Sequence, residues 1–217
     1  AAMPLSEDNM NDELWNEWQN HYRESGLNPA EICKDGIVDS SLFAVASSKV
    51  LFVLREVNKW PGGDLKELLS VGPKYQIWYA VATWAAGLLN NFPPFSAVDK
   101  LDVLSKSLRS IAAINIKKLS GGSQSDPQQI NLFARFDSVL LRRQIKQIAP
   151  QIIVACGTFD PLVWLLELDI IPIQQEKRIH FIQPAGLTVI NWRHPTRVNR
   201  QETYRELSKI FRGIQNK

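Results

Sequence analysis

The sequence predicts an α/β fold in which helices cover both faces of a mostly parallel sheet. Short apolar runs rich in β-branched residues, typical of strands buried on both faces, alternate with longer apolar or amphipathic segments of helical period. Polar residues, glycine or proline follow these short runs. Strands that alternate with helices in this order pair in parallel through right-handed crossovers, so we expect their carboxyl ends to meet along one edge of the sheet.

Length and composition favour a single domain. The chain has 217 residues, of which 45% are apolar, enough for one hydrophobic core. We expect one domain over residues 1–217, in which residues 1–30 form a helical arm. No apolar run is long enough to cross a bilayer and no leader-like pattern opens the chain, so we expect a cytoplasmic protein with no membrane partner.

Cysteine content and charge narrow the classes of ligand. Cys33 and Cys156 have neither the spacing of a zinc site nor the number that an iron–sulfur cluster needs, so we expect no metal and no cofactor. Residues 1–100 hold 8 Lys and Arg against 13 Asp and Glu, a net charge of −5, whereas residues 101–217 hold 17 against 9, a net charge of +8. Such a split is typical either of a face that meets a polyanion or of scattered solvated side chains.

The expected elements follow in chain order from periodicity and from turn residues. Residues 7–24 form an amphipathic helix with Trp15, Trp18 and Tyr22 on one face. Asp64 is the expected cap of a helix that follows a Pro-Gly-Gly turn, and Thr158 that of a later helix. The expected helices are 65–70, 75–90, 99–110, 127–149, 161–168 and 199–214; the expected strands are 50–54, 111–116, 151–156 and 187–191, with a short extra strand at 179–182 and either a helix or a strand at 42–46.

A polar segment follows each of the four main strands. These segments are residues 55–64, 115–125, 157–158 and 193–200. In open parallel sheets, ligands bind in the crevice outside the carboxyl ends of the strands. The sequence therefore predicts a functional site where the four segments converge.

Three of these strand ends resemble motifs of the uracil-DNA glycosylase superfamily. One strand runs into L-R-E-V-N-K-W-P-G-G-D at residues 54–64, a second ends in A-I-N-I-K-K at 113–118, and a third ends in I-N-W-R-H-P-T-R-V at 190–198. Their order, spacing and placement at strand ends carry the likeness, which covers residues 48–212. The resemblance implies a three-layer α/β/α sandwich with a central, mostly parallel four-stranded sheet. It also implies a protein that flips uracil or a related deaminated base out of DNA and hydrolyses its glycosidic bond.

The resemblance implies roles for individual residues. His194 matches a histidine that faces the leaving base, where a hydrogen-bond donor stabilises developing negative charge. Asn115 matches an asparagine that reads the base edge through its paired donor and acceptor. Glu56 matches the glutamate of a branch whose loop reads G-E-A-P-G, and Asn58 replaces the proline of that loop. The expected DNA contacts are Lys117, Lys118, Ser123, Arg193, Arg197 and Val198, with Arg197 and Val198 at the position of the segment that wedges into the duplex.

The first motif departs from the family pattern. Val57 occupies the place of a water-activating aspartate, and Arg55 that of a glycine that lets the substrate approach closely. Since valine cannot orient water, an active enzyme would need Glu56, Asn58 or Asp64 for this role. Each of these also has a structural interpretation: Glu56 as a solvated partner of Arg55, Asn58 as a turn residue and Asp64 as a helix cap.

Three functions are therefore open at the level of sequence. The first is a metal-free DNA glycosylase that acts by base flipping. The second is a DNA- or base-binding protein of the same fold that does not cleave. The third is an unrelated α/β hydrolase that handles nucleotides. In the first two, single- or double-stranded DNA is the expected partner, and we expect a monomer.

Overall fold

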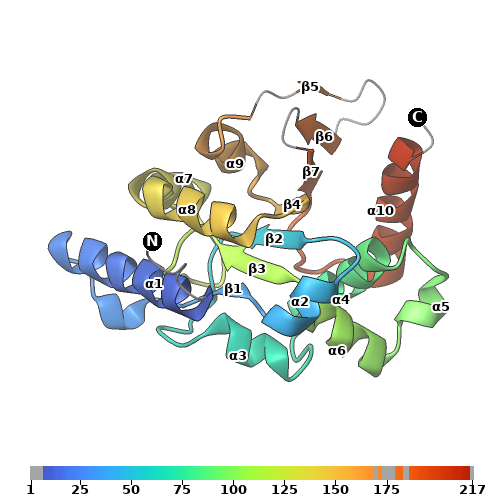
Figure 1. Ribbon diagram of the computed structural model, residues 1–217, viewed down its shortest axis with the longest axis horizontal. Coiled ribbons are helices and arrows are strands. Elements are labelled where there is room, and N and C mark those ends of the chain that lie inside the picture. Colours follow the sequence, from blue (N-terminus) through green and yellow to red (C-terminus); the bar gives the residue numbers. More distant parts are fainter. Residues whose placement is uncertain (1–6, 169–170, 173–178, 183–185, 216–217) are drawn as a thin grey trace, which may run out of the picture.

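The structure, a computed structural model, describes residues 7–168, 171–172, 179–182 and 186–215 (Figure 1). The helices in this part of the chain are α1 (Glu7–Glu24), α2 (Ser40–Val45), α3 (Leu65–Ser70), α4 (Gln76–Leu89), α5 (Phe95–Val98), α6 (Leu101–Arg109), α7 (Pro127–Phe136), α8 (Ser138–Ile148), α9 (Phe159–Leu165) and α10 (Arg200–Gln215), with a 3-10 turn η1 (Pro29–Glu31). The strands are β1 (Gly36–Ile37), β2 (Val50–Leu54), β3 (Ala112–Asn115), β4 (Ile152–Cys156), β5 (Ile171–Pro172), β6 (Ile179–Ile182) and β7 (Leu187–Trp192).

The described strands form one mixed sheet in the order β1-β3-β2-β4-β7-β6-β5. The central strands β3, β2, β4 and β7 are parallel, whereas β1 on one edge and β6 and β5 on the other pair antiparallel. The prediction of a four-stranded sheet is therefore wrong in strand number. The predicted extra strand at 179–182 is confirmed as β6. Strands β1 and β5 have two residues each, too few to give a period in the sequence.

Helices cover both faces of this sheet, as the α/β prediction required (Figure 1). Successive strand residues point to opposite faces. Val50, Phe52 and Leu54 of β2 therefore pack in the core that α3, α4, α6 and α10 cover. Leu51 and Val53 pack in the core that α1, α7, α8 and α9 cover. Because both faces are covered, every residue of β2 is buried and the strand is an unbroken apolar run.

The single helix predicted over residues 127–149 is wrong. It is divided into α7 and α8 at Asp137, a buried residue whose carboxylate accepts a hydrogen bond of 2.7 Å from the hydroxyl of Tyr22 on α1. The buried residues Ile130, Ala134, Asp137, Leu141 and Ile148 keep one helical period across the break. Leu132 and Val139, which are 66% and 73% exposed, lie on the opposite face of both helices.

Hydrogen bonds at helix ends test three of the local predictions. Residues 42–46 belong mainly to a helix, α2, which Asp39 caps. Asp64 caps α3 as predicted, and its carboxylate accepts the N–H of Lys66 at 2.8 Å. Thr158 lies at the start of α9 but makes no capping hydrogen bond. Its hydroxyl instead donates to the carbonyl oxygen of Val53 at 2.9 Å, which ties the end of β4 to β2.

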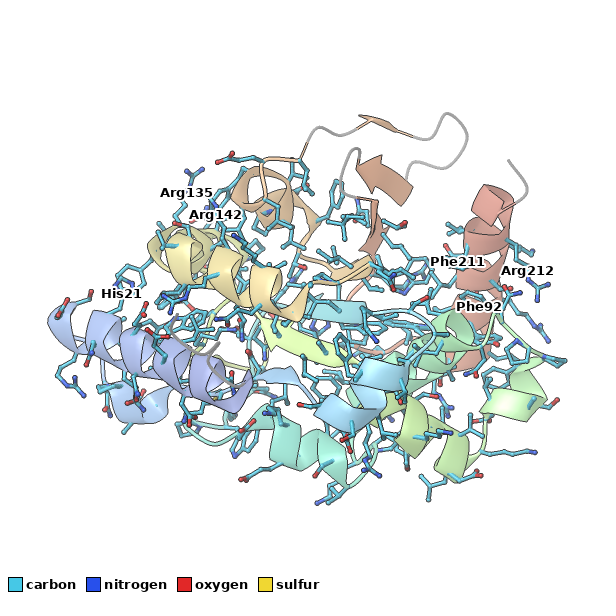
Figure 2. All side chains as sticks on the ribbon, in the orientation of Figure 1. His21, Phe92, Arg135, Arg142, Phe211 and Arg212 are labelled. Atoms are coloured by element: carbon cyan, nitrogen blue, oxygen red, sulfur yellow. The ribbon has the colours of Figure 1, made fainter. Side chains whose placement is uncertain are left out.

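The last helix, α10, packs against α4 and against the turn that follows it. The ring centroids of Phe211 and Phe92 lie 5.6 Å apart, and the Arg212 guanidinium donates to the Phe92 carbonyl oxygen at 2.7 Å (Figure 2). Farther along the interface, Trp84 Nε1 of α4 donates to Thr203 Oγ1 of α10 at 3.1 Å. The contacts of Phe211 and Arg212 hold the end of α10, whereas that of Thr203 holds its start, where the loop from β7 arrives.

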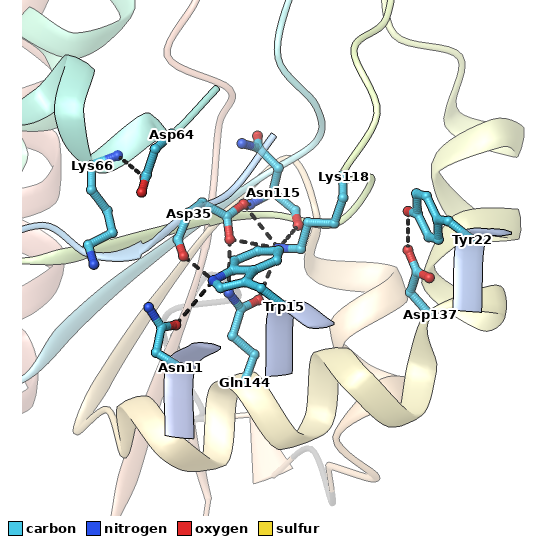
Figure 3. A network of polar contacts seen from close by, with 10 residues as sticks. All are labelled: Asn11, Trp15, Tyr22, Asp35, Asp64, Lys66, Asn115, Lys118, Asp137 and Gln144. Atoms are coloured by element: carbon cyan, nitrogen blue, oxygen red, sulfur yellow. Dashed lines mark hydrogen bonds and ion pairs between the residues drawn. The ribbon is translucent and has the colours of Figure 1, made fainter. Parts of the chain in front are cut away.

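A buried ion pair lies beyond the end of β3, where several elements meet (Figure 3). The ammonium of Lys118, which is fully buried, donates to the two Asp35 carboxylate oxygens at 2.8 and 3.0 Å. It also donates to the Asn115 carbonyl oxygen at 2.8 Å and to Gln144 Oε1 on α8 at 2.9 Å. The ring of Trp18 on α1 covers this ammonium, with its centroid 4.8 Å from the nitrogen. Burial raises the pKa of Asp35, and the charge of Lys118 opposes that shift.

We expect Lys118→Met to lower the free energy of unfolding by about 3–5 kcal/mol, because it leaves the Asp35 carboxylate buried without its counter-ion. Urea denaturation at pH 7 measures the change. Lys74→Met, at an exposed loop position, is the matched control and should change stability by less than about 0.5 kcal/mol. Asp35→Leu combined with Lys118→Met should cost less than the sum of the single changes. Equal stability of the Lys118 and Lys74 variants would contradict a structural role for the pair.

Candidate functional site

The strand order reverses between β2 and β4. From β2 the chain reaches β3 through α3, α4, α5 and α6 on one face, then crosses through α7 and α8 on the other face to β4. Helix α9 packs on that second face and follows β4. The connections after β2 and after β4 thus leave on opposite faces, and in open α/β sheets such a reversal marks where ligands bind, at the carboxyl ends of the two strands. Residues 55–58 and 157–158 lie there.

Hydrogen bonds link the ends of the four parallel strands across this edge. The N–H of Lys117 donates to the Arg55 carbonyl oxygen at 2.9 Å, which joins β3 to β2. The Nε–H of Arg55 donates to the Gly157 carbonyl oxygen at 3.1 Å, which joins β2 to β4. The N–H of Gly157 donates to the Trp192 carbonyl oxygen at 2.9 Å, which joins β4 to β7. The four polar segments predicted to converge therefore start beside one another.

Arg55 is partly buried over Gly157. Gly157 has a φ of 68°, a backbone conformation that favours glycine, and a Cβ there would lie 3.0 Å from Nη2 of Arg55 and push the guanidinium aside. No carboxylate of the described residues lies within ion-pair distance of Arg55. A guanidinium has five N–H donors, of which the contact with Gly157 uses one. Arg55 can therefore offer positive charge and several donors to a ligand.

His194 lies in the loop after β7, close enough to Arg55 to feel its charge. Burial, followed by the positive charge of Arg55, lowers the pKa of His194 to about 4. The imidazole is therefore neutral at pH 7, with one N–H donor and one acceptor nitrogen. Nδ1 lies 2.7 Å from the hydroxyl oxygen of Thr196. This contact orients the ring and leaves Nε2 without a hydrogen-bond partner among the described residues.

Glu56 is held in a second buried ion pair. Its carboxylate lies 2.7 Å from the ammonium of Lys117, and the two side chains are 3% and 6% exposed. Lys117 also donates to Gln129 Oε1 at 2.6 Å. A Cβ at Gly121 would lie 2.1 Å from the Glu56 carboxyl group, so the loop packs directly on it. Glu56 is thus neither a solvated partner of Arg55 nor open to water that would attack a sugar.

The other two candidates for orienting water differ from each other. Asp64 accepts its hydrogen bond as the cap of α3. Asn58 is exposed on a loop that two hydrogen bonds to Gly121 hold in place. The Gly121 N–H donates to the Val57 carbonyl oxygen at 2.8 Å, and the Lys59 N–H donates to the Gly121 carbonyl oxygen at 3.1 Å. Of Glu56, Asn58 and Asp64, only Asn58 has a side chain that is exposed and uncommitted in the described part of the protein.

Asn115 ends β3 with its backbone fully engaged. Its N–H donates to Asp35 Oδ2 at 2.8 Å and its carbonyl oxygen accepts from Lys118. The side-chain amide points away from this ion pair (Figure 3). Asn115 pairs with Leu54 across β3 and β2, and the residue is 3% exposed. The Asn115 amide is therefore a buried polar group that lies beside the end of β2, where residues 55–64 begin.

The residues expected to contact DNA fall into three groups. Lys117 and Lys118 are committed to buried carboxylates, so the expected phosphate contacts do not fit their geometry. Arg193 pairs with Glu206 and stacks on Trp192 at 5.1 Å from the ring centroid. The remaining members are Ser123 and Arg197, which are exposed, and Val198, which is partly buried and packs against the core beneath α10 rather than projecting as a wedge.

Sequence reasoning missed the partners that bury the two lysines. Asp35 lies 83 residues before Lys118, and Gln144 lies 26 residues after it. Neither stands in a motif, so no local signal identifies them. Gly121 belongs to a Gly-Gly pair that reads as a flexible loop, yet its missing side chain is what admits the Glu56 carboxylate. The glycine pair was the one available signal for this contact.

The carboxyl ends of β3, β2, β4 and β7, with the loops that follow them, form one edge of the sheet, called the rim below. The fold and this rim define an α/β protein with a candidate ligand site where the strand order reverses. Among the described residues, no group of three or more His, Cys, Asp or Glu side chains is arranged to hold a metal ion. Within the same residues no helix has the length and apolar content to span a membrane. Comparison of the sequence with protein-family models and with curated proteins finds no match in either.

We expect the His194 imidazole to titrate near pH 4 in an NMR pH titration. Arg55→Met should raise this pKa but leave it below about 6.5, because the variant removes a neighbouring positive charge while burial, the larger cause, remains. Arg205→Met, at an exposed position on α10, is the control and should leave the titration unchanged. Since the unfolded chain takes up a proton that the folded chain does not, stability should fall between pH 6.5 and 4. His194→Gln should remove that part of the fall. A His194 pKa at or above 6.5 in the unchanged protein would be the contrary result.

Proposed function

We propose that the protein binds DNA at the carboxyl ends of its parallel strands and holds an extruded, carbonyl-bearing base against Arg55 and His194. The observation that carries this proposal is the partly buried Arg55 guanidinium, which has no carboxylate partner in the described part of the chain and lies beside a neutral imidazole. A desolvated cation without a counter-ion is costly. A ligand that accepts hydrogen bonds from it compensates for that cost.

The donor set favours deaminated bases over their parent bases. Deamination replaces an exocyclic amino donor with a carbonyl acceptor, as in uracil, hypoxanthine and xanthine. The guanidinium of Arg55 can only donate, and the neutral ring of His194 has one N–H. The parent amino group would meet a donor at Arg55, whereas a carbonyl oxygen would accept from it. The chemistry of the rim is therefore matched to uracil or a related base.

Charge and fold support DNA as the molecule that carries the base. Residues 101–217, which supply three of the four polar segments, have a net charge of +8. The exposed Arg197 and Ser123 lie in two of these segments and are suited to phosphate contacts. In this proposal the parallel core β3-β2-β4-β7 is the four-stranded sheet of a uracil-DNA-glycosylase-like sandwich, and β1, β5 and β6 extend it at the edges.

Binding without cleavage fits the rim better than hydrolysis does. Lys117 neutralises Glu56, Asp64 caps α3, and Val57 has no polar group. One specific observation favours the glycosylase as a second candidate. Asn58 is an exposed amide two residues past Glu56, and neutral His194 is a suitable donor to a departing base. The two functions differ in whether the base is released.

We expect Arg55→Met to weaken binding of a single-stranded uracil-containing oligonucleotide by about tenfold or more, because a hydrogen bond to a charged group is lost. Fluorescence anisotropy at fixed salt measures the affinity. Preference for the uracil oligonucleotide over the same sequence with cytosine should fall in this variant. Arg135→Met, at an exposed position near the end of α7, is the matched control and should bind as the unchanged protein does (Figure 2). Unchanged affinity of the Arg55 variant would refute the assigned site.

We expect no release of uracil, hypoxanthine or xanthine from single- or double-stranded oligonucleotides above the level of a His194→Ala variant. The reason is that the Glu56 carboxylate is sequestered and Val57 cannot orient water. Chromatographic detection of the free base is the measurement. Release that is lost in both His194→Ala and Asn58→Ala would establish the second candidate, the glycosylase, instead.

A further inference from the structure

We infer that a second pocket, next to the His194 loop, binds the nucleotide that neighbours the extruded one on the same DNA strand; this inference rests on the proposed function. The pocket has a volume of about 530 Å³ and lies between α4, α5, the start of α10 and the loop after β7. That volume is within the range of small-ligand sites. The residues that decide its chemistry are Tyr79, Phe95, Pro195, Arg197 and Arg200.

One wall of the pocket is a rigid stacking surface. The guanidinium carbon of Arg200 lies 5.5 Å from the ring centroid of Tyr79 and 5.9 Å from that of Phe95. Arg200 is held by its Nε–H, which donates to Thr83 Oγ1 at 2.9 Å, and by an ion pair of 2.5 Å with Asp99. Flat aromatic and guanidinium groups are the surfaces on which nucleobases stack in proteins that bind single strands. Because its geometry is already fixed, this wall loses little entropy on binding.

The loop side of the pocket supplies one positive charge. Arg197 is exposed, and no carboxylate of the described residues pairs with it, whereas Asp99 neutralises Arg200. Arg197 has a φ of 54°, a left-handed conformation that costs free energy in residues with a Cβ. The flanks of the loop hold it there: Pro195 is buried, and Val198 packs against the core. One uncompensated guanidinium matches the single negative charge of a phosphodiester.

The pocket and the His194 site are neighbours along one loop. His194 directly precedes Pro195, which lines the pocket, so the two sites share one loop. A strand whose base reaches His194 can therefore place the adjacent base on the Tyr79 wall and the intervening phosphate near Arg197. An aromatic wall, a cation with no carboxylate partner among the described residues and the shared loop together point to a nucleotide of the same strand rather than to a separate small molecule.

The test uses a uracil-containing single-stranded oligonucleotide with the full chain. Tyr79→Leu should weaken binding by about tenfold with an unchanged salt dependence, because it removes stacking but no charge. Tyr79→Phe, which keeps the ring, should restore the affinity. Arg197→Gly removes the guanidinium while relieving the left-handed strain, so it should fold at least as well. It should weaken binding by a similar factor and lower the slope of log affinity against log salt by about 0.7.

A second oligonucleotide isolates the stacked base. One abasic residue placed directly beside the uracil, on its 5′ or its 3′ side, should weaken binding by the unchanged protein on one side only, and should have no effect in Tyr79→Leu. If Tyr79→Leu and Arg197→Gly bind normally while Arg55→Met does not, the pocket is not a nucleotide site and the proposed function stands. If Arg55→Met binds normally while the pocket variants and the abasic residue weaken binding, the pocket binds DNA and the assigned base site is wrong.

Discussion

The buried ion pair between Lys118 and Asp35 holds together the parts of the chain that form the rim. Asp35 accepts the N–H of Asn115, so the same carboxylate fixes the end of β3 and neutralises the lysine. Lys118 in turn meets Trp18 of α1 and Gln144 of α8. Such a pair adds little net stability compared with an apolar core, but any arrangement that separates its members leaves a charge unpaired in the interior. The pair therefore selects one position for the end of β3 and for the loop that follows it.

The cations at the rim divide into two sets with different consequences. Lys117 and Lys118 each face a buried carboxylate and contribute little field to solvent. Arg55 and Arg197 have no carboxylate partner among the described residues, so their charge remains available to a ligand. In the proposed function, recognition at this edge depends on these arginines, because a guanidinium forms directional hydrogen bonds and also stacks. Counting basic residues in the sequence would assign the same role to all four.

Features set by local chemistry were accessible from the sequence, and features set by distant partners were not. The strands β2, β3, β4 and β7 and the cap Asp64 depend on runs and turns of a few residues. The division of α7 from α8 falls at Asp137, whose hydrogen-bond partner Tyr22 lies 115 residues earlier.

At the rim, sequence placed His194 and the segment from Arg55 at the strand ends, as parallel strands require. It did not show that Lys117, 61 residues away, neutralises Glu56. Thr158 does not cap α9, and its hydroxyl instead donates to the Val53 carbonyl oxygen of a neighbouring strand, a partner 105 residues away.

The close contact between Gly121 and Glu56 determines where the Glu56 carboxylate lies at this edge of the sheet. Any larger residue at position 121 would overlap the Glu56 carboxyl group and force it away from Lys117. The displacement would separate the Glu56 carboxylate from the Lys117 ammonium and leave both charges without their buried partner. A single hydrogen atom in place of a side chain thus keeps this pair closed, and the distribution of charge beside Arg55 depends on a residue that carries no side chain of its own.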